Sequence, residues 1–148
     1  MKQLSECKMK SLIDYITEGL SIQKKIFVVI KPGFLDKTVD ILNIYKEEGW
    51  DVKFSTIKKL LLDEAKELYK VHKKEDFYKD LCEYMSSDVT RAFIFSKQTN
   101  DDEFKEATKI KDKIREKWGE SDMRNVVHSS DSKENMEHEA GIYFGLVW

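Results

Sequence analysis

The stretch Ile26-Phe-Val-Val-Ile30 decides the fold, because it is an unbroken apolar run without polar alternation. β-branched and aromatic residues favour strands, and a strand with no polar face is covered on both sides. We therefore expect a central strand at residues 26–30. Lys31-Pro32-Gly33 follows directly and ends it.

Strand and helix patterns alternate through the rest of the chain. Thr38 is placed to cap the next helix, and Gly49 to end it. The spacing of apolar residues then predicts strands at residues 50–57, 91–95 and 125–128, and helices at residues 63–71, 76–85, 101–118 and 132–142. This order contains two split βαβ units. It favours a ferredoxin-like α/β (α+β) sandwich with a four-stranded antiparallel sheet and flanking helices.

An amphipathic helix is predicted ahead of the central strand. Its apolar residues recur at spacings close to three or four, and they are Leu4, Met9, Leu12, Ile13, Ile16 and Leu20. We expect residues 1–24 to form a helical extension of a domain that covers residues 25–148. Packing against that domain is favoured over contact with a partner or a membrane surface.

Composition excludes several classes of function. The 148 residues suit one domain, and a hydrophobic fraction of 41% supplies a core. A balance of 28 acids against 26 bases gives a net charge of −2, which does not favour nucleic acid or membrane partners. The longest apolar runs are far too short to span a bilayer, and the first residues do not resemble a secretory signal. We expect a cytoplasmic protein with reduced cysteines.

The residues that could carry chemistry cluster toward the C-terminal end. Walker, dinucleotide-binding, HExxH and GxSxG motifs are missing from the sequence. Instead, His128 leaves an apolar strand and is followed by hydroxyl and acidic residues that can cap the next helix. Such a histidine is held rigidly at the rim of a sheet, which suits a nucleophile. A structural histidine at the surface is the alternative.

Several motifs together resemble the nucleoside diphosphate kinase family. They are Ile30-Lys31-Pro32-Gly33, the block ELYKVHKKEDFY ending at Tyr78, the turn Tyr84-Met85-Ser86-Ser87, and Arg124-Asn125-Val126-Val127-His128-Ser129-Ser130-Asp131-Ser132 with Glu139 on the following helix. The last of these is the most specific. Arg115 stands in register with the family's phosphate-binding arginine, and the resemblance covers about residues 26–144.

The resemblance implies a ping-pong phosphotransferase. His128 would take the γ-phosphoryl group of a nucleoside triphosphate and pass it to a nucleoside diphosphate, with Glu139 orienting the ring. An imidazole with an ordinary pKa of about 6.5 is largely unprotonated at neutral pH and can attack phosphorus. The implied nucleotide-binding residues are Lys31, Tyr69, His72, Tyr78, Lys109, Arg115, Asn125 and Ser130. Among them, Asn125 would bind the ribose, and Tyr78 would stack on the base. Mg²⁺ would arrive with the nucleotide, without a protein metal site of its own.

The chain also departs from the family pattern. The segment between Phe95 and Arg115 is shorter than usual, and Asp122 stands where the family tends to place an apolar wall against the base. The string Ile114-Arg115-Glu116-Lys117-Trp118-Gly119 resembles short-loop members. We expect a homo-oligomer, at least a dimer, but not necessarily a hexamer. The alternative function is a catalytically impaired nucleotide-binding or interaction module on the same fold.

Overall fold

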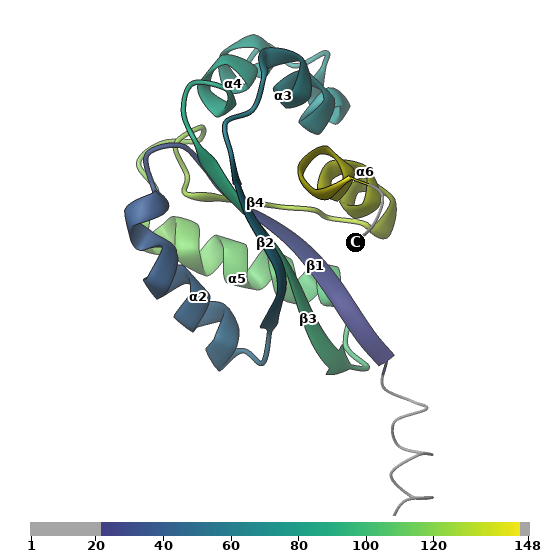
Figure 1. Ribbon diagram of the computed structural model, residues 1–148. Helices are drawn as coiled ribbons and strands as arrows, with labels where there is room; N and C mark the ends of the chain where they lie inside the picture. Colours follow the sequence, from purple (N-terminus) through teal and green to yellow (C-terminus); the bar gives the residue numbers. More distant parts are fainter. Residues whose placement is uncertain (1–21, 146–148) are drawn as a thin grey trace, which may run out of the picture.

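The computed structural model describes residues 22–145, so the helix expected over residues 4–20 lies outside them, whereas residues 22–24 of the expected extension belong to a strand. Its four strands, β1 (Ile22–Ile30), β2 (Asp51–Lys58), β3 (Thr90–Thr99) and β4 (Val127–Ser129), form an antiparallel sheet in the order β2-β3-β1-β4 (Figure 1). This confirms the ferredoxin-like class. The helices are α2 (Thr38–Glu47), α3 (Leu62–Leu68), α4 (Tyr78–Met85), α5 (Glu103–Trp118) and α6 (Lys133–Phe144), with 3-10 turns η1 (Leu35–Lys37) and η2 (Lys70–His72).

Strand β1 lies inside the sheet and is covered on both faces, as its apolar run predicts. Ile26, Val28 and Ile30 pack into a core with α2 and α5. Phe27 and Val29 point to the opposite face, into a core with α3, α4 and α6 (Figure 1). The alternation of side chains along a strand thus divides one apolar run between two cores.

Element bounds differ from the predictions where distant pairing decides them. Strand β1 begins at Ile22 because the polar residues 23–25 pair with residues 96–98 of β3. Because these residues are polar, no apolar pattern in the sequence predicts that the strand begins so early. Thr38 is the first residue of α2 and does not accept a cap bond, because its hydroxyl donates to the Leu35 carbonyl at 2.6 Å. Gly49 lies just past the end of α2 with φ of 90°, as expected for a helix stop.

Strand β2 is an edge strand with exposed apolar side chains. Val52, Phe54 and Ile57 are all exposed, and the outer side of the strand has no neighbour in the sheet. Natural proteins usually cover such an edge. Among the helices of residues 22–145, none is long and apolar enough to cross a membrane.

Candidate functional site

A cavity of about 600 Å³ lies beside the ends of β1 and β4, and helices α4, α5 and α6 close its sides. Seven of the ten residues predicted for the site line it. They are Lys31, Tyr69, His72, Arg115, Asn125, His128 and Glu139. These residues come from segments that are far apart in the sequence, so the fold gathers them in one place.

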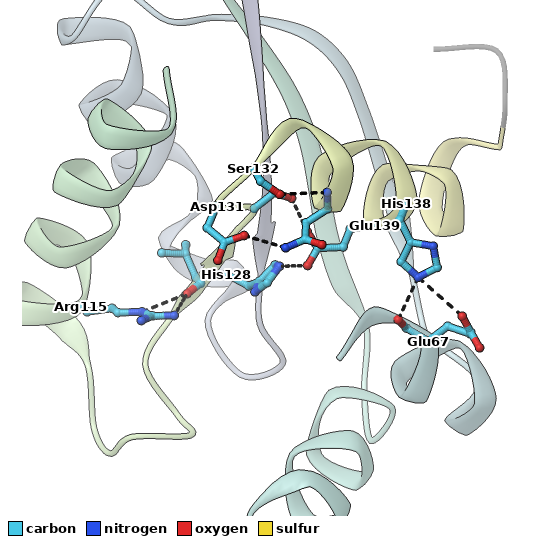
Figure 2. Close-up of polar contacts among 10 residues, drawn as sticks. Glu67, Arg115, His128, Asp131, Ser132, His138 and Glu139 are labelled. Carbon is cyan, nitrogen blue, oxygen red and sulfur yellow. Dashed lines mark hydrogen bonds and ion pairs between the residues drawn. The ribbon is translucent and has the colours of Figure 1, made fainter. Parts of the chain in front are cut away.

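His128 is held in one orientation by Glu139. The histidine lies on β4 opposite Val29 of β1, and its Nε2 is 2.8 Å from Oε1 of Glu139 on α6 (Figure 2). The other oxygen of Glu139 accepts a hydrogen bond from the Ser130 hydroxyl. Because a carboxylate only accepts, Nε2 carries the ring proton and Nδ1 keeps a free lone pair. The imidazole therefore presents Nδ1 as its nucleophilic atom.

The local sequence explains how Glu139 reaches His128. Ser132 caps α6 by accepting a hydrogen bond of 3.1 Å from the backbone N–H of Asn135. This confirms that a hydroxyl residue after the strand starts the last helix. The cap places Glu139 two turns into α6, on the side facing β4, where its side chain is only 7% exposed. Figure 2 shows His138, the neighbouring residue of α6, pointing away toward Glu67.

A strained turn precedes His128. Val126 has φ of 79°, and the N–H of Val127 donates to the carbonyl of Asn125 at 3.0 Å, which makes a γ-turn. A β-branched residue rarely adopts this conformation. In an extended strand, residues three apart project to opposite faces. The turn changes this, so that Asn125 and His128 both face the cavity.

Three cations meet at the buried end of the cavity. Lys31 is 3% exposed and donates from Nζ to the carbonyl of Met123 at 3.2 Å. Burial, together with the charges of Arg115 and Lys111, lowers the pKa of Lys31 to about 7. Burial and Arg115 also lower the pKa of Lys111. Positive groups held this closely favour a polyanionic ligand, which would restore the charge of Lys31.

Arg115 is fixed by the backbone of β4. Its Nε and Nη2 donate to the carbonyl of Val127 at 3.2 and 2.9 Å, one residue before His128 (Figure 2). Both bonds use one edge of the guanidinium group. The remaining N–H groups of its fork are left for an anion in the cavity beside the imidazole.

Two buried polar atoms in the cavity wall lack partners. Within residues 22–145, neither the Tyr69 hydroxyl nor Oδ1 of Asn125 has a hydrogen bond. Burial raises the pKa of Tyr69 well above its usual value, so the hydroxyl stays protonated and can donate. Nδ2 of Asn125 already donates to the Asp122 carbonyl at 2.7 Å, which leaves Oδ1 as an acceptor. Buried groups of this kind are normally satisfied, which points to a ligand.

Tyr78 does not reach the cavity. Its hydroxyl donates to the carbonyl of Lys66 at 3.0 Å, and Phe77 lines the cavity instead. Phe77 is 47% exposed, with its ring centroid 5.4 Å from that of His72. Neighbouring residues at a helix start point in directions about 100° apart, so only one of the two aromatics can face the site. The sequence alone does not show which one.

Lys109 also lies elsewhere, and Lys111 takes its place. Lys109 borders a separate cleft with Asp102 and Phe104. Lys111 lines the main cavity because it stands four residues before Arg115 on α5, and such residues share a helix face. That spacing could have identified Lys111 from the sequence.

Ser130 lies behind the cavity wall. It is buried, and its hydroxyl bonds Glu139 rather than facing the cavity. Ser130 therefore lies where it holds the Glu139 carboxylate in place.

Comparison with known proteins identifies relatives of this chain. The family model described as "Nucleoside diphosphate kinase" matches residues 24–146. The chain is 30% identical over 144 residues to the nucleoside diphosphate kinase of Persephonella marina, covering 86% of this chain and 97% of the relative. It is 27% identical over 135 residues to that of Kosmotoga olearia, covering 82% and 88%.

Solved structures share the fold. The Aquifex aeolicus nucleoside diphosphate kinase superposes with a TM-score of 0.69 at 24% identity, covering 83% of this chain and 96% of that chain. The Encephalitozoon cuniculi nucleoside diphosphate kinase gives a TM-score of 0.70 at 22% identity, covering 82% and 89%. The family match spans nearly the whole described chain, including the seven predicted site residues that line the cavity. The chain belongs to the nucleoside diphosphate kinase family.

Proposed function

We propose that the protein is a nucleoside diphosphate kinase, which transfers the γ-phosphoryl group of a nucleoside triphosphate to a nucleoside diphosphate through a phosphohistidine at His128. The observation that carries the proposal is the 2.8 Å contact between Nε2 of His128 and Glu139, in a cavity that three cations share. It leaves Nδ1 as the free nucleophile beside a site for phosphate.

The transfer has two balanced steps. The lone pair of Nδ1 attacks the γ-phosphorus, the bond to the β–γ bridging oxygen breaks, and the diphosphate leaves with that electron pair. A terminal β-phosphate oxygen of the second nucleotide then attacks the phosphorus. The N–P bond breaks, and its electrons return to Nδ1. Glu139 stabilises the positive charge that develops on the ring. One cavity serves both nucleotides in turn, which predicts ping-pong kinetics.

The other cavity residues divide between phosphate and nucleoside. Lys31, Lys111 and Arg115 would neutralise charge on the transferring phosphoryl group, and the Tyr69 hydroxyl would donate to it. Oδ1 of Asn125 would accept from a ribose hydroxyl. At the exposed end, the ring of Phe77 is available for base stacking, the role that the sequence analysis gave to Tyr78.

The cavity fits a magnesium ion that enters with the nucleotide. Mg²⁺ is bound by one or two carboxylates together with substrate phosphates, and it neutralises phosphate charge. Both oxygens of Glu139 are engaged by His128 and Ser130. Asp131 lines the cavity and uses only Oδ1 for Asn135, so its Oδ2 would be able to hold the ion.

Labelling separates the kinase from a module that only binds nucleotides. The protein is incubated with γ-³²P-ATP and magnesium and then denatured. A kinase gives an acid-labile, alkali-stable protein label, and a nucleoside diphosphate added before denaturation removes it as labelled triphosphate. A protein that binds ATP without acquiring label would be the impaired module, and the proposal would be wrong.

Replacing Glu139 with Gln should slow phosphoryl transfer by about tenfold to hundredfold, the range found when the carboxylate that orients a metal-bound imidazole is changed. The amide keeps the size of the side chain but not its charge. The measurement is the rate of phosphohistidine formation in a quenched-flow experiment. Glu137→Gln is the matched control, because Glu137 is an exposed residue of the same helix outside the cavity. Equal rates in the two variants would make Glu139 a structural residue only.

Replacing Lys111 with Met should lower kcat/KM by about tenfold, as expected for one partly exposed contact to a phosphate worth roughly 1.5 kcal/mol. Lys109→Met removes the same charge from the same helix but outside the cavity, and it should leave kcat/KM unchanged. Steady-state assays of the two variants make the comparison. Equal losses would show a general charge effect instead of a contact.

We further propose that the protein works as a homo-oligomer in the cytoplasm. Val52, Phe54 and Ile57 give the unpaired β2 edge an apolar surface suited to another copy of the chain. The free and buried Cys82 is in keeping with a reducing compartment. Light scattering on the purified protein should give at least twice the 17.5 kDa chain mass, and Phe54→Lys should lower it. A monomeric mass for the unaltered chain would contradict this proposal.

A further inference from the structure

Asp122 is an acidic residue at the open end of the cavity. The catalytic end is buried, since Lys31 is 3% exposed and the His128 side chain 15%. Asp122, by contrast, is exposed, as is Phe77, and both line the same cavity. When the phosphates of a nucleotide occupy the buried cations, its base must lie toward this open end.

The loop that carries Asp122 is held by its backbone. The N–H of Glu120 donates to the carbonyl of Arg124 at 2.8 Å, and Arg124 pairs with the Glu120 carboxylate. The carbonyl of Asp122 accepts from Asn125, and the next carbonyl, that of Met123, accepts from Lys31. These bonds fix the main chain on both sides of Asp122. Its carboxylate is left without a hydrogen bond or ion pair to any described residue.

Asp122 is also separate from the phosphate end. Burial and Arg115 lower the pKa of Lys111, and the carboxylates that oppose this shift are Asp112 and Asp131. Burial lowers the pKa of Arg115, and Asp112 is again the carboxylate that opposes it. Asp122 is not among the charges that shift the pKa of Lys111 or of Arg115. Its charge is therefore available to the base without repelling the phosphates at close range.

We propose that Asp122 selects guanine nucleotides, an inference that rests on the proposed function. Guanine alone among the common bases carries two adjacent donors, N1–H and the N2 amino group, on its Watson–Crick edge. A carboxylate accepts both in parallel, as it does from an arginine fork. Adenine and cytosine place a ring acceptor beside their amino group, and uracil flanks its N3–H with two carbonyls. For these bases the carboxylate makes one bond at most and faces a repelled oxygen or nitrogen.

Binding measurements on the full chain test this selection without requiring turnover. Titration calorimetry at constant magnesium gives the Kd values of GDP, ADP and inosine diphosphate, whose base has N1–H but not the N2 amino group. GDP should bind about fivefold tighter than ADP, the lower limit for a bidentate contact because the site is exposed. Inosine diphosphate should lie between them. Asp122→Asn and Asp122→Val should each bring the three Kd values close together.

Glu116→Gln is the control for overall charge, because Glu116 is exposed on α5 and does not line the cavity. This variant should keep the preference for GDP. Equal Kd values for GDP and ADP in the unaltered protein would overturn the inference, and so would a GDP preference that persists in Asp122→Val. Both results leave the kinase proposal standing. Failure to bind any of the three diphosphates would overturn the proposed function together with the inference.

Discussion

Replacing His128 with Ala should lower the rate of γ-phosphoryl transfer by a factor on the order of 10⁶, the loss found when the nucleophile of a covalent mechanism is removed. The cations would still bind nucleotide, but the imidazole that Glu139 holds beside them would be lost. The label from γ-³²P-ATP should disappear with the activity. Nucleotide affinity, measured by titration calorimetry, should change little.

The chain contains its own control for this experiment. His138 is a histidine of α6 whose Nε2 lies 3.1 Å from the Glu67 carbonyl, outside the cavity. His138→Ala should keep both label and turnover. If His128→Ala still acquired an acid-labile label, the nucleophile would be another residue, and the roles given to the residues around His128 would fall with it.

Replacing Arg115 with Ala should lower kcat/KM by about 10²- to 10³-fold, the loss observed when one preorganised donor to a developing negative charge is removed. The effect should appear mainly in kcat, because charge spreads over the equatorial oxygens in the transition state. Arg115→Lys should recover only part of the rate, since a lysine keeps the charge and loses the planar fork.

Arg115 also holds the backbone of β4 through the Val127 carbonyl, so stability must be measured beside activity. Thermal unfolding of Arg115→Ala should remain cooperative and show a folded protein at the assay temperature. Arg91→Ala is the control, because Arg91 lies on β3 over the Phe93 ring and away from the cavity. Undiminished turnover in Arg115→Ala would mean that the phosphate binds elsewhere.

Much of the fold could be predicted from local patterns. The apolar run at residues 26–30 identified the central strand, and the caps at Gly49 and Ser132 marked a helix end and a helix start. These signals act over a few residues, so the sequence displays them directly. The extension of β1 to Ile22 could not be predicted, because it depends on pairing with residues more than 70 positions away.

Site residues could be predicted where they follow one another along a single segment. They could not be predicted where the direction of a side chain decides whether it enters the cavity. The string that contains Asn125 and His128 predicted two lining residues on one segment. Tyr78 and Lys109 lie outside the cavity because a shift of one or two residues along a helix turns a side chain away from it. The sequence does not predict the γ-turn at Val126 either, because valine rarely adopts a positive φ.

The γ-turn at Val126 makes the segment from Asn125 to His128 intolerant of changes in chain length. Between Asn125 and His128, an insertion or deletion of a single residue would change the face on which the imidazole emerges and separate it from Glu139. Lineages descended from this chain should therefore keep the count from 125 to 128 fixed.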